Sequence, residues 1–295
     1  MIQALLEELR PWQWTKNLLL YAGLLFSQQL GHPDLLLRAT AGFVAFSLLS
    51  GAVYLINDLA DVEADRRHPT KRLRPIASGR LPVAAARIEL VPLLGITLAI
   101  SMWLGRGFAI VAWSYFALNL AYSFGLKKQV LIDVFVVAIG FVMRAIAGVE
   151  LLQPVSPGTE LSPWLLVCTF FGALFLGLAK RRREVVNAGG EAQQQREVLE
   201  HYSPALVEGL LLVSAATSLM GYALYTIWPA TVAKFHTEAL LYTVPFVAYG
   251  IFRYLYLVRV SESTEDPANV LLTDRPLAAC ELLYLVAVLI ILYRF

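Results

Sequence analysis

The sequence is short of cysteine, histidine and charge. Its 295 residues include two cysteines and four histidines, and only 16% are Lys, Arg, Asp or Glu. Cys168 and Cys280 lie inside apolar runs, which excludes a disulfide framework and a cysteine-based zinc site. The histidines lack the spacing of metal ligands, which argues against a His-based site. Because soluble domains carry about 25% charged residues, an ordinary water-soluble protein is excluded as well.

Hydrophobic residues make up 58% of the chain instead. A bilayer core requires about 20 mostly apolar residues per helix, and nine runs qualify. The sequence therefore predicts an all-α, polytopic membrane protein with one transmembrane domain over residues 1–295. The predicted spans are 13–31, 36–57, 85–104, 107–126, 130–151, 162–179, 204–228, 238–258 and 276–293.

The first ten residues carry Glu7, Glu8 and Arg10 among leucines. We therefore expect a short helix along the membrane interface and no cleavable signal peptide. With the N-terminus inside, 18 of the 24 Lys and Arg residues fall on inner segments and four on outer ones. The positive-inside rule then predicts a multi-pass protein of the cell membrane, with a cytoplasmic N-terminus, an outer C-terminus and cytoplasmic loops at 58–84, 180–203 and 259–275.

An acidic motif follows the second predicted span. If that helix continues, Asn57, Asp61 and Asp65 recur every four residues on one face, with Asp58 at its edge. Carboxylate and amide oxygens suit Mg²⁺, and a cationic run suited to phosphate follows. A solvated loop that obeys the positive-inside rule would explain the cations but not the acidic spacing. The motif therefore predicts a metal–diphosphate site. The polar residues of the run are Lys71, Arg72, Arg74, Ser78 and Arg80.

Several other polar residues at the expected inner surface have two interpretations. Lys16 and Asn17 could reach the site, although a lysine near a membrane surface also extends toward water without any such role. Tyr122 precedes Lys127 at the end of a span, which fits either substrate binding or an interfacial aromatic belt. Within the span 130–151, Arg144 lies about 16 Å deeper than Asp133 at 1.5 Å per residue, and a charge at that depth is usually functional or paired.

The cationic segment Lys180-Arg181-Arg182-Arg183-Glu184 fits either phosphate binding or a topology signal. Arg253 lies near the inner surface and could simply extend to it. For the loop 259–275 the sequence suggests no mechanism, and Asp274 could simply fix the loop.

The acidic motif, written Asn57-Asp58-x-x-Asp61-x-x-x-Asp65, resembles the first Asp-rich motif of the UbiA superfamily of intramembrane prenyltransferases. The resemblance continues through His68-Pro69-x-Lys71-x-x-Arg74-Pro75-Ile76-Ala77-Ser78-Gly79 and covers essentially the whole chain. It implies the UbiA-type bundle of nine helices with a cap of cytoplasmic loops. Most members have a second motif, D-x-x-x-D, after helix 6, where this chain has Lys180–Glu184 instead.

That departure is similar to the superfamily branch of decaprenyl-phosphate phosphoribosyltransferases. The branch pattern combines R-P-x-Q-W-x-K-N, K-R-R-x-E and D-R-P-L, which correspond here to segments 10–17, 180–184 and 274–277. The resemblance implies 5-phosphoribosyl 1-diphosphate as donor, a polyprenyl (decaprenyl) phosphate as acceptor, Mg²⁺ as cofactor and a role in making lipid-linked arabinose precursors of the cell wall.

The residue roles that we expect follow this chemistry. Asp58, Asp61 and Asp65 are the candidate catalytic residues, and with Asn57 they are the candidate Mg²⁺ ligands. An ionised phosphate acceptor requires no general base. The candidate substrate-binding residues are Lys16, Asn17, Asn57, Lys71, Arg74, Ser78, Tyr122, Lys127, Arg144, Lys180, Arg181, Arg182 and Glu184.

Two other functions stay open at this stage. The first is prenyl transfer from a polyprenyl diphosphate to an aromatic or other polar acceptor, which a second carboxylate cluster would favour. The second is transport or lipid binding, which would place the polar site near the membrane midplane. We expect no nucleic-acid partner, and assembly with a second copy of the chain is left open.

Overall fold

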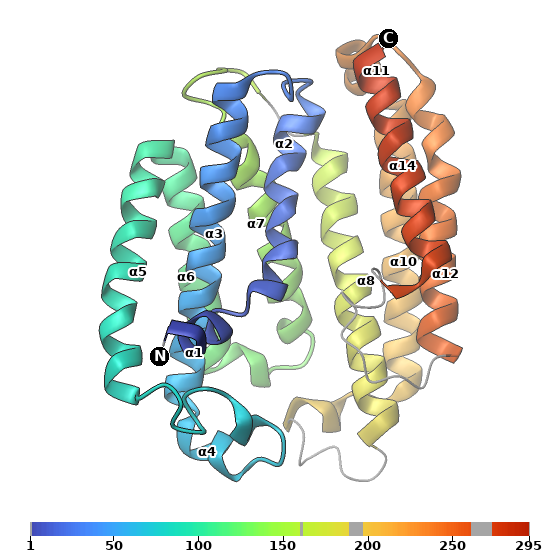
Figure 1. Ribbon diagram of the computed structural model, residues 1–295. Helices are drawn as coiled ribbons and strands as arrows, with labels where there is room; N and C mark the ends of the chain where they lie inside the picture. The colour runs from blue at the N-terminus through green and yellow to red at the C-terminus, as the bar shows by residue number, and fades with distance from the viewer. Residues whose placement is uncertain (1, 160–161, 189–196, 261–272, 295) are drawn as a thin grey trace. The chain divides into compact units, whose positions relative to one another are not determined.

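The computed structural model describes residues 2–159, 162–188, 197–260 and 273–294 (Figure 1). These residues form helices and turns with no strand among them, which confirms the all-α prediction. The chain divides into two compact units, residues 1–124 with 143–160 and residues 125–142 with 161–295. Helix α7 (Ile132–Glu150) contributes its first part to the second unit and its last part to the first.

Eight helices of the described chain are long and apolar enough to cross a membrane. The protein is therefore a multi-pass membrane protein, and the predicted count of nine is approximate. Besides α7, the long helices are α3 (Pro33–Ala60), α5 (Val83–Leu104), α6 (Arg106–Phe124), α8 (Pro163–Ala188), α10 (Pro204–Ile227), α12 (Val244–Val260) and α14 (Arg275–Arg294).

The first predicted span, 13–31, is the one that differs. It forms a 3-10 helix η1 (Pro11–Leu20) and a short helix α2 (Tyr21–Phe26). Two close backbone contacts accompany this irregular course: a Cβ on Gly23 would collide with the carbonyl group of Gly148, and one on Gly148 with that of Leu20. Hydrophobicity reports how apolar a run is but not these contacts, so the break was not visible in the sequence.

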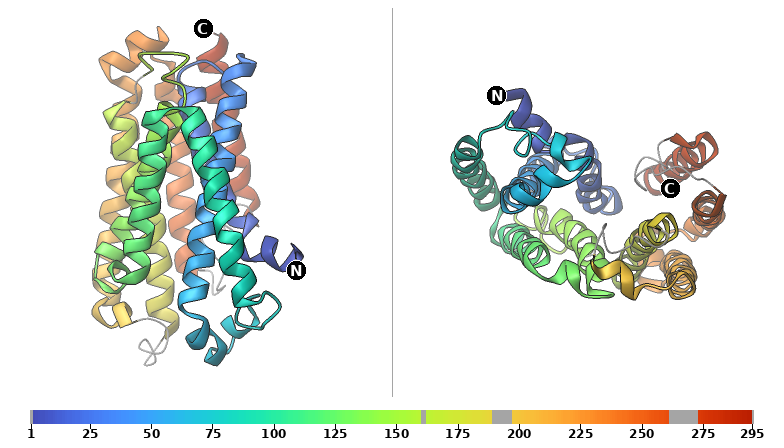
Figure 2. Two further views of the ribbon diagram at one scale, coloured as in Figure 1. Left: turned by 90° about the vertical axis from the view of Figure 1, so that its left-hand side faces the viewer. Right: turned by 90° about the horizontal axis from the view of Figure 1, so that it is seen from below.

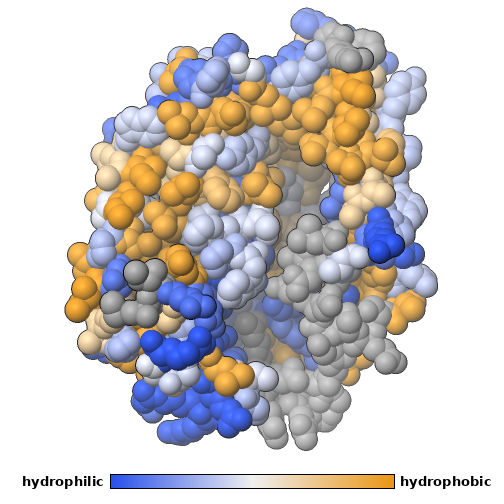
Figure 3. Space-filling view, in the orientation of Figure 1, coloured by the Kyte–Doolittle hydropathy of each residue, from blue (hydrophilic) through white to orange (hydrophobic). Residues whose placement is uncertain are grey.

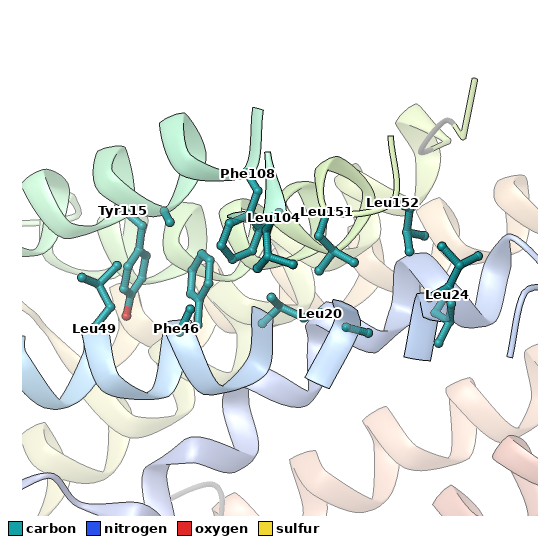
Figure 4. Packing of buried hydrophobic residues seen from close by; sticks show 14 residues of the cluster. Leu20, Leu24, Phe46, Leu49, Leu104, Phe108, Tyr115, Leu151 and Leu152 are labelled. Atoms are coloured by element: carbon teal, nitrogen blue, oxygen red, sulfur yellow. The ribbon is translucent and has the colours of Figure 1, made fainter. Parts of the chain in front are cut away.

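In the first unit, α3 packs against α5 and α6, and α5 and α6 form an antiparallel pair (Figure 2). Phe46 from α3 packs against Phe108 and Tyr115 from α6, at ring-centroid distances of 5.8 and 5.3 Å. Leu24 from α2, Ala147 from α7, and Leu151 and Leu152 directly after α7 complete this hydrophobic core (Figure 4). The predicted interfacial segment forms α1 (Ile2–Glu8).

The segment between α3 and α5 contains only short helical elements. Between α3 and α5 lie α4 (Val62–Arg67) and the 3-10 turn η2 (Lys71–Leu73). Hydrophilic side chains gather at this end of the unit, and hydrophobic ones cover much of its helices (Figure 3). The unit therefore has one distinctly polar end.

The second unit is built mainly on the pair α8–α10, with α12 and α14 packed beside it. Its core joins Phe175, Tyr254 and Leu277 from three of these helices. Helix α8 continues through Ala188, so Lys180–Glu184 are helical. The prediction that a loop begins at residue 180 was therefore wrong. The short elements of this unit are η3 (Leu126–Lys128), η4 (Glu197–His201), α11 (Pro229–Phe235) and η5 (Ala239–Thr243).

Candidate active site

The acidic motif lies where α3 ends and α4 begins. The backbone N–H of Asp61 donates to the carbonyl of Asn57 at 2.9 Å, and that of Asp65 donates to Asp61 at 2.8 Å. Helical hydrogen bonding thus continues across the junction and keeps Asn57, Asp61 and Asp65 at the spacing of one helix face.

Two arginines hold the buried carboxylates of this motif. Arg74 donates to Asp58 at 3.0 Å and to Asp65 at 2.7 Å, through the same Nη1 atom. Arg10 donates to the other oxygen of Asp58 at 2.5 Å, and its guanidinium lies 4.6 Å from the centre of the Tyr54 ring. Both oxygens of Asp58 are therefore occupied by guanidinium groups.

The helix α1 adds carboxylates to the same place. Glu8 is buried beside Asp58, and this burial together with the neighbouring carboxylate raises the pKa of Glu8 to about 8. Glu7 accepts two hydrogen bonds from Arg80, at 2.7 and 2.9 Å, and these bonds lower the pKa of Glu7. The α1 segment is thus tied to the segment between α3 and α5.

No group of three or more His, Cys, Asp or Glu side chains among the described residues converges as a ready metal site. Asn57 and Asp61 are partly exposed, whereas Asp58 and Asp65 are buried against Arg74. The assignment of these four residues as Mg²⁺ ligands stays a prediction.

Among the other predicted residues of this unit, Ser78 and Lys16 contact residues close to them in the sequence. Ser78 Oγ donates to the carbonyl of Pro75 at 3.2 Å and accepts from Arg80 Nε at 3.3 Å. Lys71 is half-buried in η2, and Tyr122 is half-buried in the last turn of α6. Lys16 in η1 contacts Gln13.

Arg144 is buried deep in the first unit, and the structure supplies the partners that the sequence did not. Its Nε donates to Asn17 Oδ1 at 2.7 Å and its Nη2 donates to the Tyr115 hydroxyl at 2.7 Å. Asn17 in turn donates to Ser47 Oγ at 3.1 Å. Asn17 and Arg144, both predicted as substrate ligands, therefore belong to one polar network inside the helices.

The cationic segment of α8 lies in the second unit, where Arg181 and Arg182 pair with carboxylates. Arg181 donates to Asp133 Oδ2 at 2.6 Å and also pairs with Glu184. The Tyr202 hydroxyl donates to the other oxygen of Asp133 at 2.6 Å and accepts from the backbone N–H of Leu131 at 2.8 Å. Burial and the bond to Asp133 raise the pKa of Tyr202 well above its usual range, so its hydroxyl stays a donor.

Arg182 also has a carboxylate partner. It donates to Glu208 at 2.7 Å and to the carbonyl of Val258 at 2.9 Å, and Glu208 pairs with Arg259 as well. Lys180 is exposed, whereas Lys127 is half-buried in η3. Of the predicted phosphate-binding run, Lys180 thus reaches furthest into solvent.

At the start of α14, Arg253 donates two hydrogen bonds to Asp274, at 3.1 and 2.9 Å. Asp274 also accepts from the backbone N–H of Leu277 at 3.0 Å, which is the geometry of a helix N-cap. Both residues that the sequence left without a role therefore fix the beginning of this helix. Most of the predicted loop 259–275 and part of the predicted loop 180–203 lie outside the described residues.

The structure thus brings predicted residues together in three groups. These are Asp58, Asp65 and Arg74; Asn17 and Arg144; and Arg181 with Glu184. Sequence reasoning did not select Glu8, Arg10, Tyr115, Tyr202 or Glu208, which hold these groups in place. Arg10 had one signal, its position at the start of the Arg10–Asn17 pattern.

These features define a membrane-embedded helical protein with an Asp-rich motif held by arginines at one end of its helices. The chain belongs to the UbiA prenyltransferase family, whose model matches residues 18–273. It is 36% identical to decaprenyl-phosphate phosphoribosyltransferase from Mycolicibacterium smegmatis, over 94% of this chain and 88% of that protein. It is 34% identical to the protein of that name from Corynebacterium glutamicum, over 98% of this chain and 86% of that protein.

A solved structure has the same fold. A UbiA homologue from Archaeoglobus fulgidus, bound to DMAPP and Mg²⁺, matches with a TM-score of 0.72 and 18% identity, over 99% of both chains. The family and its fold, both expected from the acidic motif, are thereby confirmed.

Proposed function

We propose that this protein transfers 5-phosphoribose from 5-phosphoribosyl 1-diphosphate to a polyprenyl phosphate and releases diphosphate. The observation that carries the proposal is the 34–36% identity, over nearly the whole chain, to two decaprenyl-phosphate phosphoribosyltransferases. In the reaction, the bond between C1 of the ribose and the diphosphate oxygen breaks, and an oxygen of the lipid phosphate bonds to C1. The product is a lipid-linked phosphoribose, and a role in lipid-linked arabinose synthesis for the cell wall is part of the proposal.

The donor set fits a divalent cation. Asn57, Asp61 and Asp65 offer oxygen atoms at the spacing of one helix face, and Asn57 and Asp61 are partly exposed. These three residues would hold Mg²⁺, which would neutralise the charge that develops on the leaving diphosphate. Asp58, with both oxygens bound by Arg10 and Arg74, would keep these guanidiniums in place.

Cationic side chains would bind the phosphate groups of the two substrates. Lys180 is exposed, and Lys16, Lys71 and Lys127 are partly exposed, so each can approach an anion. Arg181 and Arg182 already have carboxylate partners, so they would bind as members of neutralised pairs. The remaining proposed substrate contacts are Asn17, Ser78, Tyr122, Arg144 and Glu184.

We further propose that both units act as one domain in the cell membrane, with the N-terminus and the acidic motif in the cytoplasm and the C-terminus outside. The distribution of Lys and Arg supports this orientation.

The test of function uses the purified full chain in lipid nanodiscs with Mg²⁺. Phosphoribosyl diphosphate and decaprenyl phosphate should give diphosphate and a phosphoribosylated lipid, detected by mass spectrometry. The competing reaction uses geranyl diphosphate as donor and an aromatic acid as acceptor. The solved homologue is bound to DMAPP, which belongs to the same class of prenyl diphosphate donors. Efficient turnover of that second pair, with no product from the first, would overturn the proposal.

A further inference from the structure

A cavity of about 360 Å³ opens beside the acidic motif of the first unit. It lies between α1, the start of η1, the end of α3 and the segment around η2. Its lining includes two arginines, three carboxyl groups, a threonine and an aromatic ring: Arg10, Arg74, Glu7, Glu8, Asp58, Thr70 and Trp12. Such a mixture suits a small ligand that carries both an anionic group and hydroxyls.

The two arginines retain donors for an anion. Their side chains are 21% and 30% exposed, for Arg10 and Arg74 respectively. Among the described residues, their hydrogen bonds use Nη2 of Arg10 and Nη1 of Arg74. A guanidinium has five N–H donors in a planar fork, so each can also bind a phosphate oxygen while holding Asp58.

Glu8 lines the same cavity and is 1% exposed. Its carboxyl group lies beside Asp58, and burial together with this neighbour raises its pKa to about 8, so the group is protonated near neutral pH. Apart from Asp58, no group among the described residues forms a hydrogen bond with its carboxyl oxygens. Buried polar atoms usually have a partner, and a ligand hydroxyl can donate to the carboxyl oxygen that carries no proton.

We propose that this cavity binds the ribose 5-phosphate part of the donor, with Arg10 and Arg74 contacting the 5-phosphate and Glu8 accepting a hydrogen bond from a ribose hydroxyl. The inference rests on the proposed function for the identity of the donor. The geometry of the cavity, however, requires only that the ligand is a phosphorylated sugar. It assigns substrate-binding roles to Glu8 and Arg10, and it places Arg74 at the phosphate end.

The test measures binding without turnover. Ribose 5-phosphate and inorganic phosphate are titrated separately into the full chain in nanodiscs by isothermal calorimetry. Glu8→Leu removes the acceptor at a similar side-chain size and should weaken ribose 5-phosphate binding about tenfold. Because inorganic phosphate has no sugar hydroxyl, its binding should stay within about twofold. Arg10→Gln should weaken both ligands about tenfold or more. The control Arg66→Gln, an exposed arginine in a surface pair with Glu63, should leave both unchanged.

Leu73→Trp tests the same cavity without removing a charge. Leu73 lines the cavity and is 67% exposed, so the larger ring fits on a folded protein and occupies the ligand space. The Leu73→Trp variant should therefore abolish ribose 5-phosphate binding. Binding that survives Leu73→Trp, or a wild-type protein that binds neither ligand, would overturn the proposal.

The two proposals fail in different ways. If the protein transfers phosphoribose but neither Glu8→Leu nor Leu73→Trp weakens ribose 5-phosphate binding, the cavity proposal is rejected and the proposed function stands. Cavity-dependent binding in a protein that transfers no phosphoribose rejects the function and leaves the phosphosugar site standing.

Discussion

Asp133 and Arg181 show how this chain carries ionised side chains away from water. Each is almost fully buried, they contact at 2.6 Å, and Tyr202 and Glu184 complete their hydrogen bonding. A buried pair of this kind contributes little over an apolar pair, but removing one partner leaves a buried charge. The network therefore constrains substitutions at each of its positions.

We expect Asp133→Asn to destabilise the protein by about 3 kcal/mol, because Arg181 then keeps only Glu184 as an acidic partner. Thermal unfolding in detergent would show a lower Tm. The double variant Asp133→Asn with Arg181→Gln should recover part of this loss, since the uncompensated charge is gone. Equal losses in the single and double variants would show that the pair is not coupled.

Asp61 is the residue on which the metal assignment depends. Asp61→Asn should lower Mg²⁺-dependent diphosphate release by at least about 100-fold, since one anionic ligand is lost, while the yield of folded protein stays unchanged. The matched control is Glu63→Gln, two positions away and exposed in a surface ion pair, which should keep wild-type activity. Retained Mg²⁺-dependent turnover in Asp61→Asn would refute the assignment.

The residue types of the site were predictable, but their pairings were not. The four-residue spacing from Asn57 to Asp65 indicated a shared helix face, which the backbone keeps. Arg74 was predicted as a phosphate ligand, and its hydrogen bonds to two carboxylates of the same motif were not predicted. Arg10 and Asp58 are 48 positions apart, and a local pattern contains no information about which distant side chains meet.

At the scale of elements, the beginning of α14 depends on one carboxylate. Asp274 caps the helix through Leu277 and pairs with Arg253 of α12, and the hydrogen bonds from Arg253 lower the pKa of Asp274. Since its folded-state pKa lies below the unfolded value of about 3.9, its ionisation stabilises the folded protein above that pH.

This stabilisation should be lost as the pH falls below about 4, through the lowered pKa of Asp274. Asp274→Asn keeps an N-cap residue but removes the charge. The Tm difference between wild type and Asp274→Asn should therefore be largest near neutral pH and shrink toward pH 3. A difference that stays constant from pH 7 to pH 3 would contradict the ion-pair explanation.

The lengths of the elements were predicted unevenly. Eight of the predicted apolar runs are long helices in the structure. The length of an apolar run was sufficient to predict that a helix there can span a membrane. The end of α8 was placed too early because the cationic residues 180–183 were read as a loop, whereas Asp133, Glu184 and Glu208 neutralise two of them within the helix. A run of cationic residues in the sequence does not reveal which distant carboxylates will neutralise it in the folded protein.

For the whole molecule, membrane orientation is the property that the sequence predicts most directly. The two ends of α3 provide a matched test, because His32 and Thr70 are exposed and lie beyond opposite ends of this 28-residue helix. At about 1.5 Å per residue the helix exceeds the hydrocarbon thickness of about 30 Å.

In a variant without Cys168 and Cys280, Thr70→Cys should react with an impermeant maleimide only in inside-out vesicles. His32→Cys should react only in right-side-out vesicles or intact cells. The opposite labelling pattern would invert the proposed orientation and place the acidic motif outside.

The Arg144 network has a consequence for the order in which the protein is made. Inserting an arginine at the centre of a membrane helix costs about 2.5–3.5 kcal/mol. Its partners Asn17 and Tyr115 both precede it in the chain. Since synthesis proceeds from the N-terminus, both partners have left the ribosome before Arg144 emerges, and the last part of α7 can join hydrogen-bonding groups that are already in place.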